Sequence, residues 1–232
     1  MTAPPPPPPL TKDSRNLLRV LEHHRISLVL DVGANVGQYA SRLRQGGYRG
    51  RIVSFEPLAG AHADLLRLTE DDPAWTVAPR AAVGAAETPI RLHVSAETDM
   101  SSALDFTAEM ADLLDSSAFV ADETVPQVRL DRVFGDHAAP DDRVLLKIDT
   151  QGYERPVLDG ASGVLDRIHA IQLELSIIEV YAGEPSYLDM IAHLDRLGFA
   201  PILFLPGYFN RRTARLMQMD GVFVRKGAEG HP

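Results

Sequence analysis

Short apolar runs alternate along this chain with longer stretches whose apolar residues recur at helical spacing. The runs with the length and composition of buried strands are residues 28–32, 51–55, 75–78, 143–148 and 170–176. The stretches with helical character are residues 10–25, 38–44, 61–69, 155–165 and 186–197. This alternating order predicts a parallel sheet with right-handed crossovers, so the expected fold class is α/β, doubly wound.

The end of the chain follows a different pattern. Two apolar runs, residues 199–205 and 217–225, are separated by Pro206-Gly207 and a polar loop instead of a helix. Because short, turn-rich connections join antiparallel neighbours, these runs predict a C-terminal antiparallel hairpin. Residues 90–94 alternate apolar and polar side chains, as expected of a half-exposed strand.

The length of 232 residues suits one domain with a sizeable core. Residues 1–9 include six consecutive prolines, which exclude helix and central strand and predict an extended leader outside the fold. We therefore expect a single domain over residues 10–232. A polar, helix-prone insertion at about residues 99–123 follows the half-exposed strand, and we expect it to form a lid over an active site.

The composition restricts the expected cellular compartment and the expected binding partners of the protein. The 32 acidic residues outnumber the 23 basic ones, for a formal charge of −9, and no basic run with interleaved aromatics stands out. This balance argues against nucleic acid as a partner, although a local basic patch inside an acidic average stays open. The chain has no cysteine, no signal-peptide pattern and no apolar stretch near the roughly 20 residues that span a bilayer. We expect a cytoplasmic protein.

The glycine-rich turn at residues 33–37 is the first candidate for chemistry. Gly33-Ala34-Asn35-Val36-Gly37 follows a strand and precedes a helix that begins at Gln38. Glycine tolerates positive φ and lets the backbone approach a ligand, and the helix start offers unpaired N–H groups. The turn therefore predicts a site for a small polar ligand, with an ordinary β–α turn as the alternative.

The next strand adds an acid at its carboxyl end. Glu56-Pro57 lies where a doubly wound sheet places a carboxylate to accept hydrogen bonds from ribose hydroxyls, so the ligand is predicted to be a nucleoside. Ala81 and Ala82 follow the third strand, and their small side chains suit a loop that flanks adenine. A plain loop is the alternative there. A dinucleotide fingerprint would need a second glycine where this chain has Asn35.

These residues resemble the FkbM-like methyltransferases. The similarity runs from Val29 to Val224, and its motifs are residues 31–38, 55–57, 147–154 and 173–176. It implies a seven-stranded, mostly parallel, Rossmann-like methyltransferase sheet that binds S-adenosylmethionine. The residues expected to bind this cofactor are Asp31, Gly33, Asn35, Gln38, Glu56, Pro57, Ala81, Ala82 and Asp149.

Two acids close the fourth and fifth strands of that sheet, Asp149 and Glu174. Neighbouring strands lie about 4.8 Å apart, so the two carboxylates are expected to converge at the carboxyl edge and to act in catalysis. Like charges repel unless a cation lies between them or one keeps its proton. A Mg²⁺ or Mn²⁺ ion on both acids is the leading hypothesis. The alternatives are a metal-free site with Asp149 or a histidine (His93 or His137) as base, or a structural Glu174.

The resemblance implies O-methylation of a hydroxyl on a sugar, oligosaccharide, or glycosylated or polyketide metabolite. A nicotinamide-dependent oxidoreductase is one alternative, because it would share the role of Glu56. A non-catalytic domain that binds the cofactor and serves as a scaffold is another. The expected partner is a small-molecule or oligosaccharide acceptor, and a homodimer is compatible with the sequence.

Overall fold

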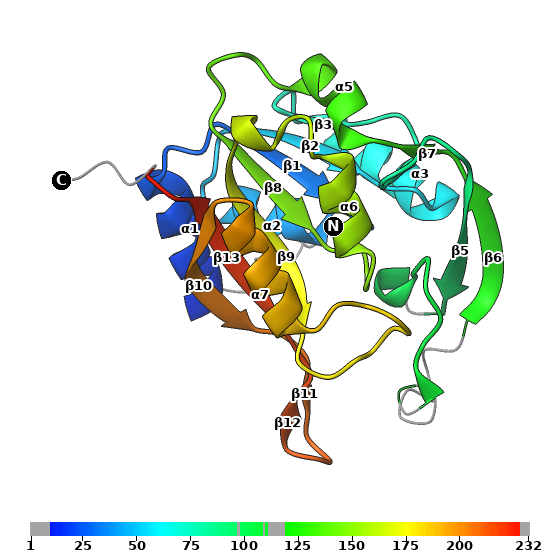
Figure 1. Cartoon of the computed structure of the whole chain (residues 1–232). Coiled ribbons are helices and arrows are strands. Elements are labelled where there is room, and N and C mark those ends of the chain that lie inside the picture. The colour runs from blue at the N-terminus through cyan, green and yellow to red at the C-terminus, as the bar shows by residue number, and fades with distance from the viewer. Residues whose placement is uncertain (1–9, 97, 109, 111–118, 228–232) are drawn as a thin grey trace, which may run out of the picture.

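The computed structural model describes residues 10–96, 98–108, 110 and 119–227, which build a seven-stranded sheet with helices on both faces (Figure 1). The strand order is β10-β13-β9-β8-β1-β2-β3. The strands are β1 Leu28–Val32, β2 Arg51–Phe55, β3 Trp75–Val77, β8 Val144–Ile148, β9 Ile168–Ser176, β10 Phe199–Pro206 and β13 Gln218–Arg225. All neighbouring pairs are parallel except those of β13, which runs antiparallel to both β9 and β10. The predicted fold class is confirmed.

In the described part of the chain, three helices cover each face of the sheet. One layer consists of α1 Lys12–His23, α2 Gln38–Gln45 and α3 Ala59–Thr69, and the other of α5 Leu130–His137, α6 Glu154–Gly160 and α7 Tyr187–Arg196. In β1, Val29 packs with the first layer while Leu28 and Leu30 pack with the second. A strand covered on both sides is apolar at nearly every position, and this is why the parallel strands appear as near-continuous apolar runs.

The helix predicted over residues 155–165 is shorter in the structure. It ends at Gly160, and Leu165–Arg167 forms a separate 3₁₀ turn. A Cβ atom on Gly160 would lie 2.0 Å from the carbonyl oxygen of Gly84, so the end of α6 packs against backbone that tolerates only glycine there.

The predicted lid is only partly helical. The described part contains a 3₁₀ turn at Thr98–Met100 and helical residues Ala108 and Met110, but Phe119–Val125 is a strand, β6, paired antiparallel with β5 Ile90–Ser95. The prediction of a helical insertion was wrong over this last part, because pairing with β5 overrides its polar composition. Residues 111–118 of the lid and the predicted leader, residues 1–9, lie outside the described residues.

Two short ladders complete the fold. The pair β4 Ala82–Val83 and β7 Gln127–Val128 is parallel, and the pair β11 Phe209–Asn210 and β12 Arg215–Leu216 is an antiparallel hairpin between β10 and β13. Because β10 is parallel to β9, this hairpin leaves the sheet at the edge where the parallel strands end (Figure 1). None of the helices in the described part of the chain has the length and apolar character to cross a membrane.

Candidate functional site

The turn after β1 brings two strand ends into backbone contact. Gly33, Asn35 and Gly37 have positive φ angles of 75°, 48° and 85°. A Cβ atom on Gly33 would lie 1.8 Å from the carbonyl oxygen of Asp149, at the end of β8, so no larger residue fits without moving the backbone. The turn after β1 and the end of β8 therefore form a single wall.

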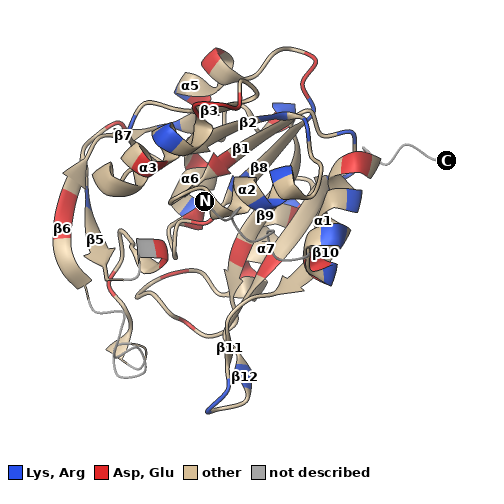
Figure 2. Cartoon of the chain, turned by 180° about the vertical axis from the view of Figure 1, so that it is seen from behind, with Lys and Arg blue, Asp and Glu red and all other residues tan. Residues whose placement is uncertain are grey.

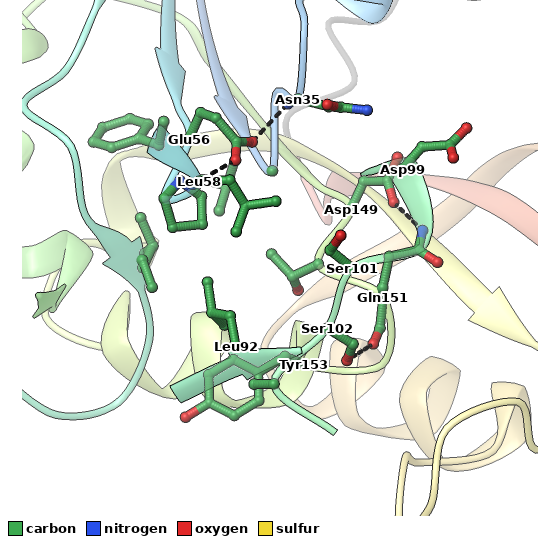
Figure 3. A pocket seen from close by; sticks show the side chains of 18 of the residues that line it. Asn35, Glu56, Leu58, Leu92, Asp99, Ser101, Ser102, Asp149, Gln151 and Tyr153 are labelled. Carbon is green, nitrogen blue, oxygen red and sulfur yellow. Dashed lines mark hydrogen bonds between the residues drawn. The ribbon is translucent and has the colours of Figure 1, made fainter. Parts of the chain in front are cut away.

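Glu56 is held rigidly at the end of β2. Its side chain is 4% exposed, and its two oxygens accept the backbone N–H groups of Asn35 at 2.7 Å and Leu58 at 2.8 Å (Figure 3). Burial raises the pKa of Glu56 to about 7, although these N–H groups act in the opposite direction. Each carboxylate oxygen still has a lone pair for a ligand hydroxyl.

A mostly apolar cavity opens beside Glu56, with Asp149 and Gln151 on its other side (Figure 3). Its wall contains eight of the nine residues predicted to bind the cofactor, namely Gly33, Asn35, Gln38, Glu56, Pro57, Ala81, Ala82 and Asp149. It also contains Leu92, Ser101, Ser102 and Tyr153, which the sequence analysis did not single out. We call this the first cavity.

Asp31, the ninth predicted residue, lies behind the turn and does not line the cavity. It is fully buried, and its carboxylate lies 3.1 Å from the Lys147 ammonium. Lys147 also lies 3.4 Å from Asp149 and donates to the carbonyl oxygen of Gly33 at 3.3 Å. Burial lowers the pKa of Lys147, but Asp31 and Asp149 more than offset this and raise it overall. One buried cation therefore ties Asp31 to the cavity wall.

A second, polar cavity of about 680 Å³ adjoins the first and shares Gly33, Gln38, Asp99, Asp149 and Gln151 with it. Both predicted catalytic acids, Asp149 and Glu174, line it. The Gln151 amide lies between them, with its nitrogen 2.7 Å from Asp149 and 3.4 Å from Glu174. The buried Tyr181 hydroxyl donates to the Gln151 carbonyl oxygen at 2.7 Å and so fixes which end of the amide faces the acids.

Burial favours the uncharged form of Glu174. Burial is the first cause that raises its pKa well above the usual range, and the nearby Asp149 carboxylate is the next. Gln218 and Gln151 both donate to the same carboxyl oxygen of Glu174, Oε2. The other oxygen, Oε1, is therefore the atom that can carry the proton and donate it to a ligand.

Comparison with known proteins identifies the family. The model of the methyltransferase FkbM domain matches residues 31–201, most of the chain. The chain belongs to the FkbM methyltransferase family. No curated protein matches this FkbM chain.

Solved structures with the same fold are distant in sequence. An rRNA methylase from Streptococcus thermophilus is 8% identical with a TM-score of 0.50, over 94% of this chain and 99% of that one. A candidate methyltransferase from Thermobifida fusca is 11% identical with a TM-score of 0.51, over 93% and 80%. A candidate S-adenosylmethionine-dependent methyltransferase from Listeria monocytogenes is 10% identical with a TM-score of 0.51, over 92% and 96%. At such identities the likeness shows the fold alone.

The FkbM family and the fold support S-adenosylmethionine as the methyl donor, and they do not support the nicotinamide-dependent alternative. The first cavity fits the adenosine part of this cofactor. Its walls are small and apolar at Ala81, Ala82 and Leu92, and Glu56 keeps lone pairs for ribose hydroxyls.

The predicted Mg²⁺ site on Asp149 and Glu174 of this FkbM domain is not supported. No group of three or more His, Cys, Asp or Glu side chains within the described ranges is placed to hold a metal ion. The Gln151 amide donates to both acids, the Lys147 ammonium lies 3.4 Å from Asp149, and burial raises the pKa of Glu174 well above its usual range. These three features relieve the repulsion that the metal was predicted to relieve.

The two histidines considered as bases do not line either cavity. His93 contacts Asp122 at 2.7 Å in the β5–β6 ladder, and the His137 ring packs edge-on against Phe55.

Several residues of the FkbM domain's second cavity were missed by sequence reasoning. They are Gln172, Gln218, Asp220, Tyr208 and Arg42. A signal was present, because Gln172 and Glu174 in β9, and Gln218 and Asp220 in β13, are polar residues two apart in apolar strands. Residues two apart share a sheet face, and the register pairs Glu174 with Asp220.

Proposed function

We propose that residues 10–232 form one S-adenosylmethionine-dependent O-methyltransferase domain that acts on a hydroxyl of a sugar, oligosaccharide, or glycosylated or polyketide metabolite. The observation that carries this proposal is the position of Asp149, which lines both the apolar cavity and the polar cavity. A carboxylate at that junction reaches the reacting atoms from the acceptor side.

The cofactor supplies a methyl group on a positively charged sulfur, and the chain supplies alignment and proton transfer. Asp149 accepts the proton of the acceptor hydroxyl, because its side chain is 38% exposed and lines both cavities. Glu174 donates a hydrogen bond from its protonated oxygen to a second acceptor oxygen. Glu56 holds the ribose hydroxyls.

The polar cavity supports an acceptor with several hydroxyls. Four glutamine side chains and four carboxyl groups line it, namely Gln38, Gln151, Gln172, Gln218, Asp99, Asp149, Glu174 and Asp220. Amides and carboxyls together donate and accept hydrogen bonds, and each acceptor hydroxyl needs both. The volume of about 680 Å³ lies in the range of small-molecule sites.

The same lining argues against a nucleic-acid acceptor. A phosphodiester that entered the cavity would face four carboxyl groups and two cations, Arg42 and Lys147, and Asp99 and Asp149 lie at the junction with the first cavity. We also propose a cytoplasmic location, since a chain without cysteine requires no oxidising compartment.

The test is a screen of mono- and oligosaccharide acceptors with labelled S-adenosylmethionine. On an acceptor found this way, Asp149→Asn should lower kcat about 10²- to 10⁴-fold while cofactor binding is retained, since it removes the general base. Asp141→Asn, at an exposed surface acid, is the matched control and should be fully active.

Three results would contradict parts of this proposal. A fully active Asp149→Asn variant would remove the assigned base. Turnover lost in EDTA and restored by Mg²⁺ would return the metal to the mechanism. Cofactor binding without turnover on any hydroxylated acceptor would favour the non-catalytic scaffold.

A further inference from the structure

Charge is segregated within the C-terminal part of the chain. Residues 197–219 contain three arginines and no acidic residue, a formal charge of +3 in a chain of −9, which leaves −12 for the remainder. All three arginines, Arg211, Arg212 and Arg215, lie in the β11–β12 hairpin (Figure 2). A basic element on an acidic protein marks a site for an anionic partner.

The hairpin has a defined shape that holds these arginines outward. Phe209 pairs with Leu216 and Asn210 with Arg215 across the ladder. The buried Asn210 side chain accepts the backbone N–H groups of Arg212 and Thr213, which fixes the turn at the tip. All three arginines are exposed, and within the described part of the chain their guanidinium groups form no ion pair.

Large apolar side chains are exposed in β10, which leads into the hairpin, and at the start of the hairpin itself. Four of the nine exposed large apolar residues in the described structure lie between positions 202 and 209, namely Ile202 at 38%, Phe204 at 44%, Tyr208 at 42% and Phe209 at 51%. Arginine next to exposed aromatic and aliphatic side chains is the combination found at the boundary between lipid headgroups and acyl chains.

The hairpin also stands next to the proposed acceptor cavity. It leaves the sheet at the carboxyl edge of the parallel strands (Figure 1). Tyr208 at its base lines the second cavity. A surface bound by the hairpin would therefore lie near the mouth of that cavity.

We propose that the β11–β12 hairpin, together with Ile202 and Phe204 of β10, docks the protein on an anionic lipid membrane. The arginines pair with anionic headgroups, and Phe209 and its apolar neighbours insert at the interface. A membrane is favoured over nucleic acid because the apolar side chains include an aliphatic one, Ile202, and because the neighbouring cavity is lined with carboxylates. Docking presents the second cavity to a hydroxylated headgroup carried by the bilayer.

This inference does not rest on the proposed function, since docking needs neither cofactor nor acceptor. The test is co-sedimentation of the full chain with vesicles of phosphatidylcholine mixed with phosphatidylglycerol, and with vesicles of phosphatidylcholine alone. We expect binding to the anionic vesicles only, and weaker binding as salt is added.

Charge reversal at the tip separates the hairpin from the rest of the surface. The triple variant Arg211→Glu/Arg212→Glu/Arg215→Glu should bind anionic vesicles more weakly by at least about a hundredfold, since each lost arginine contributes about 1 kcal/mol near such a surface and each new glutamate is repelled by it. Phe209→Ser should give an intermediate loss. The matched control reverses three exposed charges elsewhere, Lys12→Glu/Arg19→Glu/Arg91→Glu, and should retain most of the binding.

Circular dichroism and thermal unfolding confirm that each variant is folded. Equal binding of wild type and the hairpin triple variant to anionic vesicles would overturn the proposal, and so would equal losses in the hairpin and control variants. Binding of wild type to a labelled RNA oligonucleotide, with no binding to either vesicle, would overturn it in favour of a nucleic-acid partner.

Discussion

The buried carboxyl groups of the two cavities are stabilised by different kinds of neighbouring group. In the first cavity, both oxygens of Glu56 accept backbone N–H groups, and the nearby Lys147 charge has only a smaller influence on the pKa of Glu56. In the second cavity, Asp149 and Glu174 are surrounded by side chains, namely an ammonium group and two amides. The first cavity therefore depends on the course of the backbone, whereas the second depends on residues brought together from several strands.

This difference matters for specificity. A site made of backbone changes little when surface residues change, which suits a cofactor that is the same in every reaction. A site made of side chains from β8, β9 and β13 can be altered one residue at a time, which suits the recognition of one acceptor among many. Lys147 supports both cavities, because it contacts the Asp149 carboxylate and the Gly33 carbonyl oxygen.

Removing the shared cation should have the largest effect. Lys147→Met leaves Asp31 buried without its partner, and breaking such a pair costs about 3–5 kcal/mol of unfolding free energy. Lys226→Met removes an exposed ion pair with Asp195 and should cost less than about 1 kcal/mol. Urea unfolding of both variants is the measurement. Equal stabilities would show that Lys147 does not hold the two cavities together.

A substitution of Glu56 tests the predicted ribose site in the first cavity. Glu56→Gln keeps the shape but turns an NH₂ group toward the N–H of Asn35 or Leu58, and the remaining oxygen cannot serve both and the ribose. We expect S-adenosylmethionine to bind roughly tenfold to a hundredfold more weakly by calorimetry, the loss typical of a charge-assisted hydrogen bond. Glu70→Gln, at an exposed helix end, should bind as wild type. Unchanged affinity in Glu56→Gln would remove Glu56 from the ribose site.

Buried acid in the first cavity also predicts how stability depends on pH. Burial raises the pKa of Glu56 from 4.5 to about 7 in the folded protein, so the folded state keeps a proton that the unfolded chain releases. The contribution of Glu56 to the free energy of unfolding is therefore fully present below pH 4.5. It falls as the pH rises toward 7, by at most about 1.4 kcal/mol per pH unit.

Glu154 contributes in the same direction, because burial raises its pKa to about 7 as well. Urea unfolding between pH 4.5 and 7 should show that the free energy of unfolding falls more steeply for wild type than for Glu56→Gln. The difference in slope should correspond to one proton. Parallel curves would mean that Glu56 is ionised equally in both states.

The smallest expected effect concerns the second cavity, whose acids are held by side chains. Tyr181→Phe removes the hydroxyl that fixes the Gln151 amide, so Gln151 can turn its oxygen toward the acids. One lost neutral hydrogen bond predicts a fall in kcat of about threefold to tenfold, with KM for the cofactor unchanged. Tyr187→Phe, on the outer helix layer, is the control. A change in the cofactor KM alone would place Tyr181 in the first cavity's support instead.

The sequence predicted the backbone-built half of the molecule well. Central strands such as Leu28–Val32 are visible as apolar runs because they are covered on both faces, and the positive φ angles at Gly33 and Gly37 are what glycine predicts. The short ladders β4–β7 and β11–β12 were not predicted, since two residues are too few to show a period.

The side-chain half was harder to predict for a physical reason. Asp149 and Glu174 could be placed at one sheet edge, but the position of Gln151 between them depends on a turn with positive φ at Gln151 and on Tyr181, which is distant in sequence. Lys147 was part of a recognised motif without a role, because only the buried environment shows that it balances Asp31. Such charge balance is a property of the folded structure.

The contact between Gly33 and the Asp149 carbonyl oxygen constrains how this enzyme can diversify. With 1.8 Å between a hypothetical Cβ and that oxygen, no mutation can insert a side chain between the two turns, so the spacing between the turn after β1 and Asp149 is inherited unchanged. New acceptor preferences must then arise farther out, at positions such as Tyr208, Arg42 and Asp220. A library that randomises these outer positions and spares Gly33 should therefore yield altered selectivity among variants that remain folded.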